Sequence, residues 1–141
     1  SIPYGTVMSV KGTPMDFTER KEIRQDLKSA YDQLVKGNGY DHNWVIKRER
    51  EGLALAARAW DKLCGRGMEV WTDMPGLQFY TANYLDDSLP GKNGAVYGAR
   101  HGYCFETQYY PDAVNHPQFP SPVIKAGIEK LTETVYRFYT E

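Results

Sequence analysis

The sequence has few cysteines, almost no excess charge of either sign, and no long apolar run. Cys64 and Cys104 are the only cysteines among 141 residues, too few for a disulfide framework, and they form no CxxC pair. We interpret both as thiols of a reducing compartment, with a single disulfide as the alternative. Metal-ligand spacing is also missing from the sequence, so we expect no metal site.

The net charge is only −1, which argues against a strong electrostatic attraction to nucleic acid or to a membrane. No stretch approaches the ~20 apolar residues that span a bilayer, and no N-x-[ST] sequon occurs. The charge run at 47–51 alternates in sign and indicates a solvated turn. Together these features favour a cytoplasmic protein.

The sequence is rich in aromatic residues, which make up 13% of the chain beside 41% hydrophobic and 25% charged residues. Such a composition is typical of a folded domain rather than a disordered one, and the length suits one domain. Aromatic rings pack the cores of β-sandwiches and also stack on sugars, and core packing accounts for most of them.

Short strand-like runs recur between Gly, Pro, Asn and Asp turn signals. In one of them Leu77, Phe79 and Thr81 alternate with polar or amphipathic residues, as expected for a strand with one buried face. The predicted strands are 6–10, 44–47, 53–60, 68–72, 77–81, 103–108 and 132–139. This pattern predicts an all-β fold, an antiparallel sandwich or barrel.

Three segments depart from the strand pattern. Apolar residues recur at helical spacing over 19–35, and Gly37 and Asn38 provide a stop, so we predict one short helix there. The segments 86–95 and 110–125 are rich in Gly or Pro and are predicted to be long loops. Long loops on a β scaffold are where sites are often built.

Several motifs, in order along the chain, resemble those of the galactose mutarotase (aldose 1-epimerase) family. They are GTPMDF at 12–17, GYDHNWV at 39–45, PGLQFYTAN at 75–83, CFETQ at 104–108, and PD with NHPQFP between 111 and 120. The resemblance implies a large antiparallel β-supersandwich, of which residues 1–141 would be the C-terminal portion of a single domain. The family's N-terminal portion carries an Asn-Arg pair and two histidines, and we expect it to be absent from this chain and to be its partner.

The resemblance implies a reaction that interconverts the α and β anomers of galactose or glucose. A base removes the proton of the C1 hydroxyl, an acid protonates the ring oxygen, and the opened aldehyde recloses on its other face. General acid–base catalysis suffices, typically about 10²–10⁴-fold for each partner, so no cofactor is implied.

Glu106 corresponds to the catalytic glutamate of the family and is the predicted base. Its neighbours Tyr103, Cys104 and Phe105 predict a strand in surroundings of low polarity, and partial desolvation makes a carboxylate a stronger base. Spacing alone would instead favour a glutamate on a solvated strand face.

Asp41 and Gln78 correspond to substrate-binding residues of the family. A carboxylate can accept hydrogen bonds from two sugar hydroxyls, and an amide can both donate and accept. Without the motifs, Asp41 would be interpreted as a turn residue and Gln78 as an exposed strand residue.

None of the three histidines, His42, His101 and His116, occupies the family position of the catalytic acid. We therefore expect the acid histidine to lie in the N-terminal portion, with His101 as the alternative. We expect Asn115 and His116 to organise their loop through side chain–backbone hydrogen bonds.

Two other functions are compatible with the sequence. The chain could be a carbohydrate-binding β-sandwich without turnover, because Glu106 would lack an acid opposite it. It could also belong to a hexose-6-phosphate epimerase, with Arg100 and Lys92 as the candidate phosphate ligands, although the motifs fit the unphosphorylated-sugar branch better.

Overall fold

The computed structural model describes residues 4–141, which fall into two compact units. The first contains Thr6–His42 and Phe79–Cys104. The second contains Tyr4 and Gly5 together with Asn43–Gln78 and Phe105–Glu141. Antiparallel strands dominate and helices are short, which confirms the predicted fold class.

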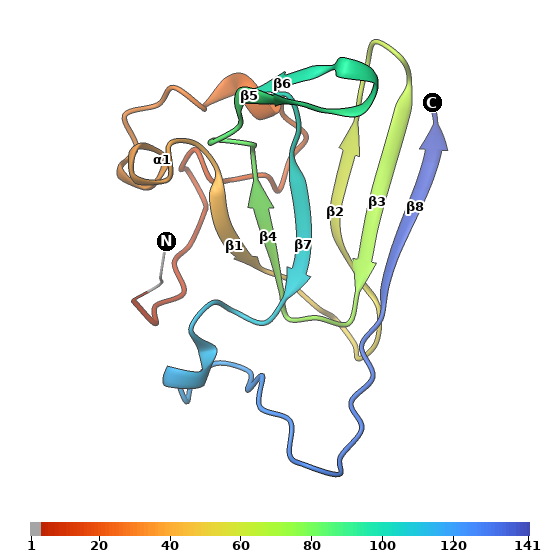
Figure 1. Ribbon diagram of the computed structural model, residues 1–141. Coiled ribbons are helices and arrows are strands. Elements are labelled where there is room, and N and C mark those ends of the chain that lie inside the picture. The colour runs from red at the N-terminus through yellow and green to blue at the C-terminus, as the bar shows by residue number, and fades with distance from the viewer. Residues whose placement is uncertain (1–3) are drawn as a thin grey trace. The chain divides into compact units, whose positions relative to one another are not determined.

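A three-stranded antiparallel sheet forms much of the second unit (Figure 1). Its order is β2 (Ala54–Trp60), β3 (Arg66–Thr72) and β8 (Thr134–Thr140), and the predicted strands 53–60, 68–72 and 132–139 are thereby confirmed. Val70, in the central strand, pairs with Ala57 on one side and with Tyr136 on the other. Each strand obtains its backbone partners from the sheet, and β3 obtains them on both edges.

The core of this unit consists of Ile46, Val70 and Leu77, with Phe105 packed against them. Leu77 belongs to β4 (Gly76–Tyr80), where the burial alternates as the sequence predicts: Leu77 and Phe79 are buried and Gln78 is half-buried. The sheet that includes β4 has the order β1 (Asp41–Val45), β4, β7 (Cys104–Gln108).

The run 47–51 is exposed, as predicted for a solvated turn, except at Arg48, which is half-buried. Its guanidinium donates hydrogen bonds to the carbonyls of Gly52 at 2.7 Å and Thr72 at 3.1 Å, and also to the carbonyl of Met74. The Arg48 side chain thus supplies hydrogen-bond donors to backbone carbonyls at the end of β3 and just after it. The alternating charges of the run do not predict this role.

The N-terminal segment contains no strand at 6–10, contrary to the prediction. Val7 and Met8, two of its apolar residues, are exposed, so no packing within the described chain holds this segment in a sheet. The predicted single helix over 19–35 is also wrong. A 3-10 turn, η1 (Ile23–Gln25), and the helix α1 (Asp32–Gly37) lie there instead. Ser29 accepts a hydrogen bond from the amide of Tyr31, a local bond that competes with helix formation between them.

The segment 86–95 is not an irregular loop, as expected, but part of a hairpin. Strand β5 (Asp86–Pro90) pairs with β6 (Val96–Gly98), with the turn η2 (Lys92–Gly94) between them. All five residues of β5 are exposed. Because neither face of the strand is buried, its sequence has no alternation of apolar and polar residues that would predict a strand. The segment 110–125 is irregular as predicted, apart from η3 (Ala113–Asn115).

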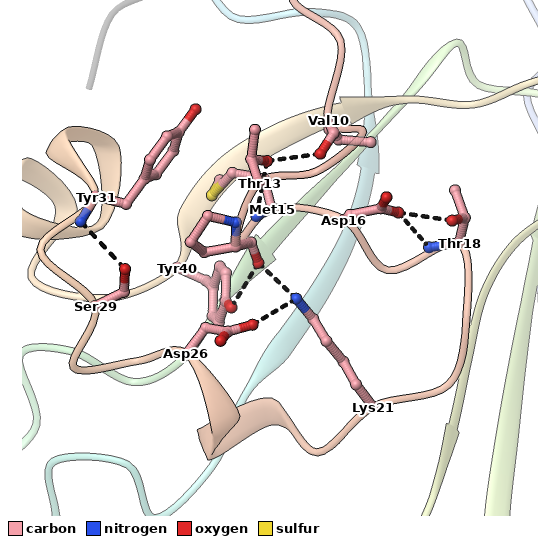
Figure 2. Close-up of polar contacts among 11 residues, drawn as sticks. Val10, Thr13, Met15, Asp16, Thr18, Lys21, Asp26, Ser29, Tyr31 and Tyr40 are labelled. Carbon is pink, nitrogen blue, oxygen red and sulfur yellow. Dashed lines mark hydrogen bonds and ion pairs between the residues drawn. The ribbon is translucent and has the colours of Figure 1, made fainter.

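The first unit has an aromatic core that joins the 12–17 motif to the 39–45 motif. The ring of Phe17 lies edge-on to those of Tyr40 and Phe79, at centroid distances of 5.1 and 5.6 Å, and Tyr40 stacks on Phe79 at 5.4 Å. Figure 2 shows the polar side of this core, where Lys21 pairs with Asp26 at 2.8 Å. Tyr40 and Lys21 both donate to the carbonyl of Pro14, at 2.9 and 2.7 Å.

Replacing Tyr40 with phenylalanine is expected to cost about 0.5–1.5 kcal/mol, the usual net contribution of one hydrogen bond. Burial, followed by the nearby charge of Asp26, raises the pKa of Tyr40 to about 12. The phenol therefore ionises first in the unfolded chain, and its stabilising effect is complete below about pH 10 and declines toward pH 12. Urea titrations at pH 7 and pH 11 measure both effects. The exposed Tyr4, changed in the same way, provides the control, and an equal loss in both variants would contradict the assignment.

Candidate functional site

Asp41 opens β1 in the first unit and is half-buried. Its backbone amide donates a hydrogen bond to Nδ1 of His42 at 3.1 Å. The preceding residue, Tyr40, is fully buried, so the chain leaves the core at Asp41. Asp41 is therefore an anchored residue rather than the turn aspartate that spacing alone would indicate.

Gln78 and Glu106 lie in the second unit, on the neighbouring strands β4 and β7. Glu106 is exposed, whereas Phe105 beside it packs against the core of the unit. The partial desolvation expected for Glu106 is thus not found in this chain, because successive residues of a strand point to opposite faces and its apolar neighbour faces the core.

Residues from three motifs meet around Gly76 in the second unit. A Cβ on Gly76 would come within 2.6 Å of Oδ1 of Asn43 and 3.0 Å of the Tyr110 ring, so a side chain has no room there. Gln108 donates to the same Asn43 oxygen at 3.4 Å. The 39–45, 75–83 and 104–108 motifs therefore contain residues that pack together, in addition to those expected to bind sugar.

The three histidines are all engaged with nearby groups. His101 is exposed, and its Nδ1 accepts a hydrogen bond from the amide of Gly98 at 3.2 Å, in the turn after β6. Nε2 of His116 lies 3.3 Å from Oδ2 of Asp112 without forming a hydrogen bond to it, and the other oxygen of Asp112, Oδ1, accepts from the Asn115 amide. The loop is thus organised by side chain–side chain contacts, not by the side chain–backbone bonds expected.

His42 is packed against α1, where its ring lies 3.1 Å from the position that a Cβ on Gly37 would take. Desolvation is the largest effect on the ring and lowers the pKa of His42, against the opposing influence of Asp41. A neutral ring also agrees with Nδ1 accepting a hydrogen bond. His42 therefore supports the backbone at Asp41.

Stability is expected to fall on mild acidification because of His42. An unfolded histidine has a pKa of about 6.5, and the folded value is lower, so below that pH the unfolded chain takes up the proton first. The contribution of His42 is complete above about pH 6.5 and is lost as the pH falls through the folded pKa. Urea titrations at pH 7.5 and 5.0 should show a smaller drop for His42→Gln than for the natural protein. His101→Gln should retain the full drop, and a full drop in both variants would exclude His42 as its source.

Arg100, the first candidate phosphate ligand, is an exposed residue whose guanidinium is hydrogen-bonded within the first unit. Its guanidinium donates to Oδ1 of Asn83 and to the carbonyl of Asn38, and lies 3.3 Å from the carbonyl of Thr81. Lys92 stands in the exposed η2 turn. These contacts give Arg100 a structural role that its neighbours in the sequence do not indicate.

In the described part of the chain, no helix is long and apolar enough to cross a membrane. No group of three or more His, Cys, Asp or Glu side chains among residues 4–141 is placed to hold a metal ion. Cys64 and Cys104 are exposed and do not form a disulfide.

Comparison with known proteins decides the family. The family model for aldose 1-epimerase matches residues 1–137, nearly the whole chain. The chain belongs to the aldose 1-epimerase family. Its membership confirms the resemblance inferred from the motifs.

The relatives agree with this assignment. Human galactose mutarotase is 42% identical over 137 residues, which are 97% of this chain and 38% of that protein. Aldose 1-epimerase of Escherichia coli K12 is 33% identical over 142 residues, 99% of this chain and 40% of that protein. The crystal structure of an aldose epimerase homologue from C. elegans matches with a TM-score of 0.77 and 25% identity, over 99% of this chain and 40% of that chain. The chain thus spans well under half the length of these relatives.

Proposed function

We propose that the protein containing this chain is an aldose 1-epimerase that interconverts the α and β anomers of galactose or glucose. The observation that carries the proposal is the 42% identity to a galactose mutarotase across 97% of the chain. The placement of Glu106 supports it, since an exposed carboxylate on β7, beside the strand of Gln78, is accessible to a ligand.

In this proposal Glu106 is the general base. Its carboxylate accepts the proton of the C1 hydroxyl while the C1–O5 bond breaks and an acid protonates O5. Rotation about C1–C2 and the reverse proton transfers then close the ring on the other face. Both steps need only a base and an acid at hydrogen-bond distance, about 2.6–3.2 Å.

Asp41 and Gln78 are the proposed sugar ligands. The carboxylate of Asp41 accepts hydroxyl hydrogen bonds, and charge-assisted bonds of this kind are about twice as strong as neutral ones. The Gln78 amide can both donate and accept, so it can select a particular pattern of hydroxyls. Binding by these groups holds the anomeric carbon at the base.

We assign the general acid to a histidine in a portion of the protein preceding this chain. Support comes from the contacts of the histidines described above: His42 is packed beneath Asp41, and His101 and His116 organise their own turns. The same portion is the proposed partner of the chain. Apolar side chains such as Phe138, which is 75% exposed on β8, and Tyr136 beside it, at 47%, give it a surface on which to pack.

Polarimetry tests the proposal directly. The approach of freshly dissolved α-D-galactose to its anomeric equilibrium is followed with the intact protein and with residues 1–141 alone. We expect acceleration by the intact protein and none by the isolated segment. Acceleration by the segment alone would move the acid to one of its own histidines, with His101→Gln as the variant that identifies it.

A carbohydrate-binding protein without turnover is the second candidate. The exposure of Glu106, together with the engaged histidines, favours it if no acid is supplied from elsewhere. Galactose binding by the intact protein without any acceleration of mutarotation would select this candidate. A hexose-6-phosphate epimerase is less well supported, because Arg100 is committed to Asn83 and Asn38.

A further inference from the structure

A buried polar network lies behind Asp41 in the first unit, centred on Asn83. The side chain of Asn83 is 4% exposed. Its Nδ2 donates to the carbonyls of Gly37 at 2.8 Å and Tyr40 at 3.0 Å. Its Oδ1 accepts from Oγ1 of Thr81 at 2.7 Å and from Nη1 of Arg100. An amide has two donor hydrogens and two acceptor lone pairs, so every bonding position of Asn83 is used.

The network holds the backbone immediately before Asp41. Besides the two carbonyls bound by Asn83, the carbonyl of Asn38 accepts from Nη2 of Arg100. Thr81 adds two bonds to Tyr40: its backbone amide donates to the Tyr40 carbonyl at 3.0 Å, and its hydroxyl accepts from the Tyr40 amide at 3.1 Å. The stretch 37–40 is therefore fixed along its length.

Gly39 shows how closely the network encloses this stretch. Its φ is +126°, a conformation that residues with side chains rarely adopt. A Cβ there would lie 2.6 Å from both Nη1 of Arg100 and Oδ1 of Asn83. The guanidinium and the amide thus occupy the space beside the Gly39 backbone, where a side chain would otherwise lie. This close contact restricts the backbone conformation just before Asp41.

Asn83 is buried, and Arg100 reaches it from an exposed position. Burying an amide is costly unless every group is satisfied, and an apolar group of the same shape is often at least as stable. What a saturated network does provide is a single backbone conformation. Here that conformation belongs to the residues preceding Asp41, whose own amide is bound by His42. Sites lose affinity when a ligand-binding group can move, even by about 1 Å.

We propose that Asn83 and Arg100 are positioning residues for sugar binding, which fix residues 37–40 so that the carboxylate of Asp41 is held in place for the hydroxyls. The inference rests on the proposed function, because it takes Asp41 as a sugar ligand. Neither positioning residue needs to contact the sugar. Their effect therefore passes entirely through Asp41, and that dependence can be measured.

Arg100→Lys in the intact protein is the principal test. Lysine keeps the charge but cannot reach Asn83 and Asn38 with a planar fork of donors. We expect KM for D-galactose in the polarimetric assay to rise about tenfold, as for the partial loss of one charge-assisted hydrogen bond, with kcat changed less than about twofold. Arg24→Lys, at a side chain that is 81% exposed in the same unit, should leave both constants unchanged.

A double-mutant cycle separates positioning from general destabilisation. If Arg100 acts through Asp41, adding Arg100→Lys to Asp41→Asn should raise KM by less than twofold over Asp41→Asn alone. Equal effects in the two backgrounds, or an unchanged KM in the single variant, would overturn the inference. Asn83→Asp, which places an acceptor against the carbonyls of Gly37 and Tyr40, should raise KM in the same way, and a thermal melt confirms that each variant is folded.

Failure of the proposed function gives a different pattern. If the natural protein binds galactose without accelerating mutarotation, the enzyme proposal fails. The same double-mutant cycle can then be measured by calorimetry as the Kd for galactose. It still tests whether Arg100 acts on sugar binding through Asp41. If the natural protein binds no sugar, Asp41 is not a sugar ligand and both proposals are overturned.

Discussion

Replacing Glu106 with glutamine is expected to lower kcat for galactose mutarotation by about 10²–10⁴-fold, the usual contribution of one general base. The substitution keeps the size of the side chain but removes its ability to take a proton at neutral pH. KM should change little, because binding is assigned to Asp41 and Gln78. The measurement is the initial rate of optical rotation change, at several galactose concentrations, with the intact protein.

Glu129→Gln provides the matched control, since it makes the same change at an exposed position of the same unit. Its kinetics should equal those of the natural protein. A Glu106→Gln variant that retains more than about a tenth of the natural kcat would exclude Glu106 as the base, given the size of the effect expected.

Leu77→Ala should produce the largest loss of stability, about 2–5 kcal/mol, as for other buried leucines. Leu77 is 4% exposed and shares the core of the second unit with Ile46 and Val70. Its removal leaves a cavity in that core, on the face of β4 opposite to Gln78. In a urea titration the midpoint should fall with little change in slope, because the surface exposed on unfolding is nearly the same.

The exposed Leu63 serves as the control for this loss. It is 90% exposed, so Leu63→Ala should change the free energy of unfolding by no more than about 0.5 kcal/mol. Equal effects at the two positions would show that the core described here does not stabilise the folded chain.

The strands of the second unit could be predicted because they carry a hydrophobic signal. In β4 the alternation of buried Leu77 and Phe79 with half-buried Gln78 follows the period of two that the sequence displays. The exposed hairpin of β5 and β6 has no such period, so it was predicted to be a loop. The helix predicted over 19–35 failed for the opposite reason: the apolar spacing is present, but a local hydrogen bond from the Tyr31 amide to the Ser29 hydroxyl competes with helix formation.

The candidate site could be predicted only as far as the family resemblance extends. Asp41, Gln78 and Glu106 were assigned from motifs, and their roles remain proposals. The contacts of Asn83 with Gly37 and Tyr40 join residues more than 40 positions apart in sequence. Such bonds depend on how the chain folds back on itself, so neither propensity nor periodicity can reveal them.

The packing of Gly76 and Asn83 bears on how such proteins diverge. Both residues belong to the motif at 75–83, and neither needs to meet a sugar: Gly76 makes room for Asn43 and Tyr110, and Asn83 binds backbone carbonyls. A descendant that lost the carboxylate at position 106 could keep the same packing at Gly76 and the same backbone contacts at Asn83, since neither involves Glu106. Part of the 75–83 motif is thus explained by packing and backbone contacts rather than by catalysis. A descendant could therefore retain this motif after it had lost enzymatic activity.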